Sequence, residues 1–168
     1  MPGPKVTWLG HAGFKIETEH EGQSKVIYID TWTDNPKFPD SVDRKITDAD
    51  LVLVTHGHFD HSESSNKLIL QSTKKDAKLV ANFEIVKYFL KKRMDGVPEE
   101  NVSPMNKSGT VDFGFCRVTM VSADHSSSCG IPEGDNFEGG AAGGFIIRFP
   151  GTDVTIYHAG DTGVFGDM

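Results

Sequence analysis

The sequence predicts one α+β or layered α/β domain over residues 1–168. Short segments rich in β-branched and aromatic residues fill the first third of the chain, and such segments favour strands. A helical section follows, and short strand-like segments return after Gly96. This order, strands, then a βα section, then strands, is typical of a layered domain in which helices cover a sheet.

The first predicted strands cover residues 5–10, 13–18 and 25–30, with glycine or polar turns between them. Residues 26–29 form a continuous apolar run, which is typical of a strand buried on both faces. A loop with two prolines follows, and residues 50–55 then form another short buried strand. That strand leads directly into a histidine-rich stretch.

The clearest helix is predicted over residues 83–94. Asn82 is a suitable N-cap, Glu84 lies in the positive first turn, and Gly96 can end the helix. The apolar stripe of this helix consists of Ile85, Val86, Phe89 and Leu90. A second helix is predicted over residues 64–73, with a short strand at 78–81 between the two.

The remaining strands are predicted by short apolar runs between turn residues. They cover residues 102–105, 110–113, 115–123, 144–150 and 153–159.

Composition narrows the class of function. The net charge of −7 disfavours sequence-independent binding to nucleic acid or to an anionic membrane, because both need a cationic face. No apolar run approaches the roughly 18 residues of a membrane span, and the N-terminus has no signal-peptide core. Two cysteines are too few for a disulfide framework. We therefore expect a cytoplasmic protein with a small-molecule substrate and no nucleic-acid or membrane partner.

The stretch 55–61, THGHFDH, carries three of the seven histidines. Because alternate residues of an extended backbone point the same way, His56 and His58 can project together from the strand end. Asp60 and His61 follow as the chain turns towards a helix. Imidazole and carboxylate ligands together favour zinc, iron or manganese over calcium or magnesium. The stretch therefore predicts a metal site, with ligands enough to serve two neighbouring ions.

Further ligands are expected from distant segments. His125 follows one predicted strand and Asp161 follows another. Alone, His125 could be a surface histidine and Asp161 a turn residue. Together with the primary motif, both become candidate ligands.

These motifs resemble the metallo-β-lactamase superfamily, whose signature is H-x-H-x-D-H. The segments WLGHAGF, VIYIDTWTDNP, VTHGHFDH and YHAGDTG look like its branch of uncharacterised metal-dependent hydrolases that resembles the L-ascorbate-6-phosphate lactonases. The resemblance implies an αββα sandwich. It also implies hydrolysis of a small ester, lactone or phosphoester by a metal-bound hydroxide.

The resemblance also implies the ligand roles. His56, His58 and His125 would bind one metal, Asp60 and His61 the other, and Asp161 would bridge them. Asp60 would also act in catalysis, by orienting the nucleophile or accepting its proton. One or two zinc ions are expected, with manganese or iron as alternatives and di-iron redox members as another possible class.

One departure concerns the end of the chain. Family domains are longer and carry another metal-binding histidine in the second half, whereas no histidine follows Asp161 here. We therefore expect a domain truncated at the C-terminus, with an incomplete second half and a second copy covering its exposed face. Water, another histidine or a partner chain could replace the missing ligand. The alternative function is an inactive metal-binding fragment with a structural or interaction role.

Four other residues carry side chains that can bind a metal. We favour a place near the metal site for His11 over a plain turn residue. Asp30 is either a turn or cap residue or a carboxylate that supports a ligand histidine. His158 is interpreted as structural, and Cys129 as a bystander rather than a replacement ligand.

Overall fold

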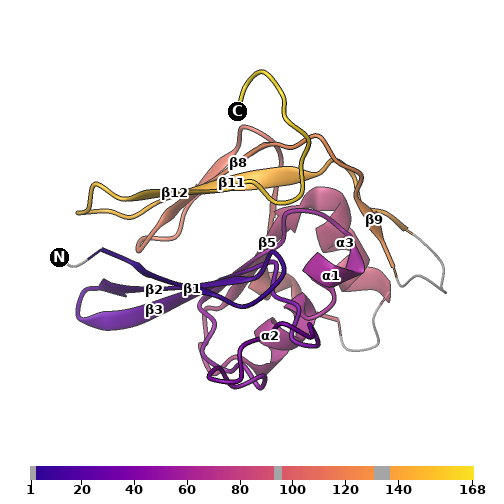
Figure 1. The fold of residues 1–168 in the computed structure, drawn as a ribbon. Coiled ribbons are helices and arrows are strands. Elements are labelled where there is room, and N and C mark those ends of the chain that lie inside the picture. The colour runs from indigo at the N-terminus through magenta and orange to yellow at the C-terminus, as the bar shows by residue number, and fades with distance from the viewer. Residues whose placement is uncertain (1–2, 93–95, 131–136) are drawn as a thin grey trace.

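The computed structural model describes residues 3–92, 96–130 and 137–168, and shows two β-sheets packed face to face (Figure 1). Helices lie on the outer side of the first sheet. Within the described residues, no helix covers the outer side of the second sheet.

The first sheet has six strands in sequence order. They are β1 (Lys5–Trp8), β2 (Phe14–His20), β3 (Gln23–Ile29), β4 (Leu51–Leu53), β5 (Lys78–Asn82) and β6 (Val102–Met105). Strands β1 to β3 are antiparallel, whereas β3 to β6 run parallel. The carboxyl ends of β3 and β4 therefore meet at one edge of the sheet, where ligand sites of α/β folds form.

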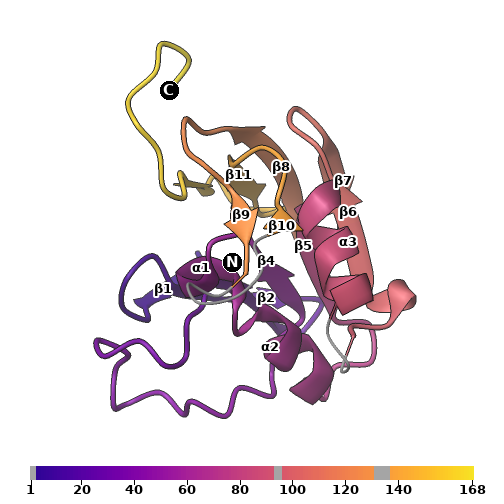
Figure 2. The same ribbon diagram turned by 90° about the vertical axis from the view of Figure 1, so that its right-hand side faces the viewer.

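The second sheet is antiparallel, with the strand order β12-β11-β8-β7. Its strands are β7 (Thr110–Asp112), β8 (Arg117–Ser122), β11 (Gly143–Arg148) and β12 (Thr155–His158). A small pair, β9 (Ser128–Cys129) and β10 (Phe137–Glu138), lies beside helix α3 (Figure 2). The sequence patterns did not predict β9 or β10.

The helices are α1 (Phe59–Ser62), α2 (Ser65–Gln71) and α3 (Phe83–Lys92), with a 3-10 turn η1 (Glu99–Asn101). The predicted N-cap is confirmed, because Asn82 Oδ1 accepts a hydrogen bond from the Ile85 amide at 2.9 Å. Met94, the predicted last helical residue, lies outside the described residues. No helix in the described part of the chain has the length and apolar character needed to cross a membrane.

The core has two layers, because the side chains of each central strand alternate between the sheet faces. On β3, Val26 and Tyr28 pack with the helix layer, while Ile27 and Ile29 face the second sheet. The residues that fill the inter-sheet layer with them include Leu51, Leu53, Val80, Val118, Met120, Phe145 and Ile147. The predicted doubly buried run is confirmed.

Candidate metal centre

The histidine motif leaves the end of β4, crosses the seam between the sheets and enters α1. Its Gly57 lies tightly against segment 127–129, since a Cβ atom there would be 2.6 Å from Cys129 Sγ. The Gly57 amide also donates a hydrogen bond to Ser127 Oγ at 3.0 Å. Any side chain at this position would push the motif away from the second half of the chain.

One cluster joins His56 and His58 of the motif with His125, which follows β8. Each offers a ring nitrogen, and the three nitrogens lie within 4.8 Å of one another. His56 Nε2 and His58 Nδ1 are 3.0 Å apart. The structure thus brings together the three residues that the sequence analysis assigned to one metal.

The tautomer of His56 suits a ligand. Thr55 Oγ1 donates its only proton to Asp30 Oδ2 at 2.6 Å, so it accepts from His56 Nδ1 at 3.0 Å. This leaves the lone pair of His56 Nε2 facing the cluster. Burial, followed by the charge of neighbouring His61, lowers the pKa of His56 to about 3. The ring is therefore neutral at physiological pH, as a metal ligand must be.

A second cluster contains His11, Asp60 and His61, whose ligand atoms also lie within 4.8 Å of one another. His61 is fully buried, and its Nε2 has no hydrogen-bond partner among the described residues. Asp161 Oδ2 lies 3.4 Å from this nitrogen as an ion-pair partner, and a bound cation or water would satisfy the nitrogen.

Asp161 lies between the two clusters. Its Oδ2 is 3.4 Å from His61 Nε2 and 3.8 Å from His125 Nε2. Gly160 turns the chain with φ +64°, and a Cβ there would lie 2.8 Å from Thr55. This close approach brings Asp161 beside His61 and His125, at the place expected for a ligand that both metals share.

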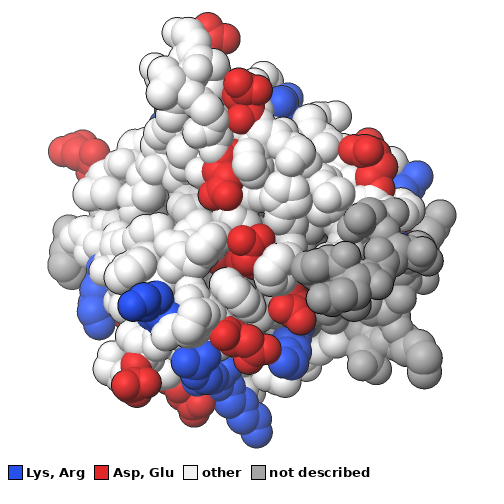
Figure 3. Space-filling model, turned by 45° about the vertical axis from the view of Figure 1, so that its right-hand side comes forward, with Lys and Arg blue, Asp and Glu red and all other residues white. Residues whose placement is uncertain are grey.

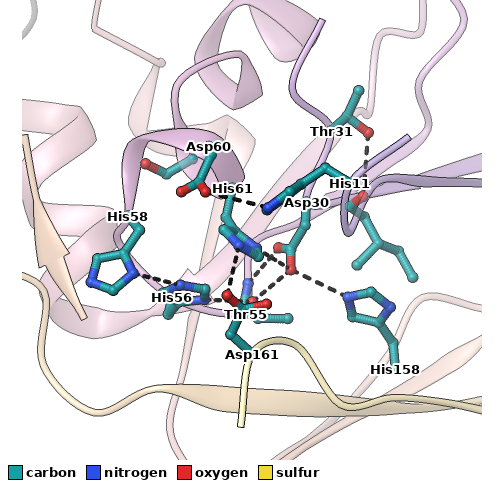
Figure 4. A network of polar contacts seen from close by, with 12 residues as sticks. His11, Asp30, Thr31, Thr55, His56, His58, Asp60, His61, His158 and Asp161 are labelled. Atoms are coloured by element: carbon teal, nitrogen blue, oxygen red, sulfur yellow. Dashed lines mark hydrogen bonds and ion pairs between the residues drawn. The ribbon is translucent and has the colours of Figure 1, made fainter. Parts of the chain in front are cut away.

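Asp30 lies at the centre of a polar network that includes His61, Thr55 and His158 (Figure 4). Its buried carboxylate accepts hydrogen bonds from the Thr55 amide, the Thr55 hydroxyl, His61 Nδ1 and His158 Nε2, at 2.9, 2.6, 2.9 and 3.2 Å. Burial opposes its ionisation, but the bonds from His158 and His61 outweigh burial and hold the pKa of Asp30 well below its usual range. Of the two roles weighed for Asp30, this geometry favours support of a ligand histidine.

The same carboxylate fixes His61. Burial lowers the pKa of His61, but the hydrogen bond and charge of Asp30 outweigh burial and raise it. With Nδ1 bound to Asp30, a metal at Nε2 would take the place of the second proton. The ring then acts as a neutral ligand whose orientation Asp30 sets.

The donors fit a metal ion that imidazole and carboxylate groups bind. Ligands at about 2.0–2.1 Å from tetrahedral zinc lie about 3.3 Å from one another. Three of the donor pairs are separated by 3.0, 3.4 and 3.8 Å, and the ligand atoms of each cluster lie within 4.8 Å of one another. Imidazole and carboxylate donors and the orphaned His61 Nε2 agree with this fit.

His158 and Cys129, which the sequence did not assign as ligands, both lie near the site. His158 bonds to Asp30 and belongs to no ligand cluster of the described residues. Cys129 is buried beside Gly57, likewise outside those clusters. Sequence reasoning missed Thr55, which links Asp30 to His56, and Ser126, whose Oγ lies 3.2 Å from His58 Nε2. The place of Thr55 directly before the motif was the only available signal.

Two facing sheets, helices on one outer side and paired His/Asp clusters at the seam define a metallo-β-lactamase-like protein. Residues 25–168 match the model of the beta-lactamase superfamily domain, and the chain belongs to that family. The predicted family and fold class are confirmed.

Two relatives illustrate the match. The chain is 39% identical over its whole length to a UPF0173 metal-dependent hydrolase of Rubrobacter xylanophilus, and spans 64% of that protein. It is 42% identical to another UPF0173 metal-dependent hydrolase, from Koribacter versatilis, and spans 66% of it. The chain thus spans slightly less than two thirds of the length of these relatives.

Solved structures agree. Igni18, a metallo hydrolase from the archaeon Ignicoccus hospitalis, superposes with a TM-score of 0.74 at 26% identity, over 98% of this chain and 63% of that one. CmlA, a diiron β-hydroxylase from Streptomyces venezuelae, superposes with a TM-score of 0.58 at 15% identity, over 93% and 29%. The second likeness concerns the fold alone.

Proposed function

We propose that this chain is a metal-dependent hydrolase that acts on a small ester, lactone or phosphoester. The observation that carries the proposal is the pair of donor clusters that face each other across Asp161. Such an arrangement can hold two ions close together. The names of the relatives as metal-dependent hydrolases support the same reaction class.

Each residue has a role in this proposal. A bound divalent metal would lower the pKa of coordinated water to about 7 and polarise a carbonyl or phosphoryl oxygen. His56, His58 and His125 would hold one ion, Asp60 and His61 would hold the other, and Asp161 would contribute to both sites. Asp30 keeps the His61 ring oriented. Half-buried Asp60 lies at the rim of the site, where its carboxylate can orient the attacking water or accept its proton.

We propose zinc as the metal, because two clusters of imidazole and carboxylate donors suit it. Iron and manganese accept the same donors. Elemental analysis of the purified protein decides among the three.

The proposed partner is a small molecule in the cytoplasm. Figure 3 shows Lys and Arg gathered at the lower end of one face beside Asp and Glu, and acidic side chains along its middle. With a net charge of −7, this distribution does not favour a nucleic-acid backbone.

The test combines metal analysis with an activity panel. Wild type, His56→Ala and the control His20→Ala are assayed on phosphodiester, ester and lactone substrates, since His20 lies on a strand away from the clusters. We expect turnover in wild type and the control, and a loss of more than about 100-fold in His56→Ala, above the range for residues that only support a ligand.

Turnover that survives in His56→Ala contradicts the proposal. Bound metal without turnover on any substrate favours the alternative, a metal-binding chain with a structural or interaction role.

A further inference from the structure

We propose that His11 is a ligand of the second metal, together with Asp60, His61 and Asp161. The inference rests on the proposed metal-dependent function. It adds a ligand from the first loop of the chain that the H-x-H-x-D-H motif and its downstream partners do not include.

The geometry of the His11 ring suits a ligand. Its Nε2 lies 3.4 Å from Asp60 Oδ2, close to the roughly 3.3 Å expected for two ligands of one tetrahedral zinc ion. The His11 and His61 ring centroids are 5.0 Å apart at 75°, so the rings meet edge to face. In Figure 4 the His11 ring points towards Asp60 from the side opposite His58.

The backbone at His11 adopts a strained conformation that holds the ring in place. His11 has φ +51°, in the left-handed region that favours glycine or asparagine. The turn around it is fixed by hydrogen bonds from Trp8 Nε1 to the His11 carbonyl at 2.9 Å and from the Leu9 amide to the Gly13 carbonyl at 2.8 Å. Strain of this kind gathers at functional sites, where the surrounding structure enforces it.

A plain surface ion pair explains these facts less well. The side chains of His11 and Asp60 are 35% and 27% exposed, and a pair of that exposure adds little stability. Such a pair gives no reason for a histidine at a position where glycine is unstrained. The Trp32 ring, with its centroid 5.9 Å from that of His11, further restricts the imidazole.

The ligand count also favours coordination. Without His11 the second site has Asp60, His61 and the shared Asp161. With His11 it has four protein donors, one of which, Asp161, would be shared with the other ion.

The test is a metal titration that does not depend on turnover. Metal-free wild type, His11→Gly and the control His20→Ala are titrated with Co²⁺, followed by visible absorbance, and zinc stoichiometry is measured by elemental analysis. Glycine keeps the left-handed turn unstrained, so a change in binding reports the imidazole and not the backbone. Circular dichroism confirms that each variant is folded.

We expect two equivalents in wild type and His20→Ala. In His11→Gly one equivalent should bind as in wild type, and the other should weaken by about 100-fold or more, above the range for supporting residues.

Two equivalents of unchanged affinity in His11→Gly overturn this inference and leave the hydrolase proposal intact. A single equivalent in wild type also overturns it, because His11 then does not complete a second site. A wild-type chain that binds no metal removes the proposed function as well.

Discussion

Asp30 shows how one buried carboxylate can organise several segments. It joins the end of β3 to Thr55, to His61 in α1 and to His158 in β12. The link from Asp30 to His158 spans 128 residues of sequence. A single substitution at Asp30 therefore tests the support of the proposed second metal.

We expect Asp30→Asn to weaken the second metal equivalent by roughly 10–100-fold, because the amide no longer stabilises His61 in its ligand orientation. The first equivalent should change less. The exposed Asp153→Asn is the control, and the same Co²⁺ titration is the measurement. Equal affinities in Asp30→Asn and the control would contradict the supporting role.

Gly57→Ala is a prediction about stability. The added Cβ would lie 2.6 Å from Cys129 Sγ and 3.0 Å from the Ser128 backbone, so the motif or segment 127–129 must move. Overpacking of this kind costs about 1–3 kcal/mol. Urea unfolding measures the cost, and Gly166→Ala, whose Cβ meets no atom within 4 Å, is the control. Similar unfolding midpoints for both variants would show that the contact between Gly57 and segment 127–129 can accommodate a methyl group.

The sequence predicts single residues well where one motif contains them. His56, His58, Asp60 and His61 stand within six residues, so their spacing alone indicates a shared site. The part played by Thr55 was not predictable, because it depends on a hydrogen bond to Asp30, 25 residues away.

At the scale of elements, the first strands are held to the loop before β4 by a polar triad. Asp48 accepts hydrogen bonds from Tyr28 at 2.8 Å and from Lys15 at 3.0 Å. Burial opposes ionisation of Asp48, but these bonds outweigh burial and lower its pKa. The triad therefore couples β2 and β3 to that loop most strongly when Asp48 is ionised.

The pH dependence follows from that direction. A carboxyl whose pKa is lower in the folded state stabilises the fold above its unfolded pKa of about 3.9, and this stabilisation is lost as pH falls through the folded pKa. Since Asp48 is 44% exposed, solvent screening limits its contribution to about 1 kcal/mol or less.

We therefore expect Asp48→Asn to lower the free energy of unfolding at pH 7 by up to about 1 kcal/mol. The difference from wild type should shrink towards pH 2. Urea titrations of the metal-free proteins at both pH values measure this, with Asp153→Asn as control. A difference that stays constant with pH would remove the electrostatic explanation.

Most elements were predictable because local pattern and burial agree. The apolar run of β3, the N-cap of α3 and the strands of the second sheet all carry such patterns. The strands β9 and β10 were not predictable, because two-residue strands hold no periodicity and are defined only by their pairing with each other, Cys129 with Phe137 and Ser128 with Glu138. The same limit applies to Asn82, whose side chain also donates to the Gly139 and Ala141 carbonyls, at 2.7 and 2.8 Å.

At the scale of the whole molecule, the surface where the edge strands β1 and β12 of the two sheets come together is apolar. A cavity of about 320 Å³ lies there between β1, β2 and β12, and its lining includes Val6, Phe14 and Tyr157. Val6 and Tyr157 are 49% and 45% exposed. Strand β12 pairs only with β11 among the described strands, so its other edge can accept a strand.

We propose that a second copy of the chain pairs along β12, since an antiparallel edge can pair with itself about a two-fold axis. Sedimentation velocity should show a dimer that dissociates on dilution, and Tyr157→Lys should shift it to monomer. The exposed Asp153→Asn should leave it unchanged. A wild-type chain that sediments as a stable monomer at all concentrations would contradict the proposal.

Chelation should raise amide hydrogen exchange in segments 124–129 and 159–163, because His125 and Asp161 would lose the ions that they are proposed to bind. Amides in β3 and β4 should change less, since both strands are central in the first sheet. Unchanged exchange throughout would show that the metal does not order these segments.

The placement of the ligands on both sheets has a thermodynamic consequence. His56 and His58 come from the first sheet, whereas His125 and Asp161 follow strands of the second, and one backbone hydrogen bond from Gly143 to the Thr55 carbonyl crosses beside them. The ions would then link the two sheets, and their binding free energy would add to the free energy that holds the sheets together. At a free metal concentration of 100 times Kd this linkage adds about 2.7 kcal/mol. The melting temperature of such a protein would therefore rise with the free metal concentration around it.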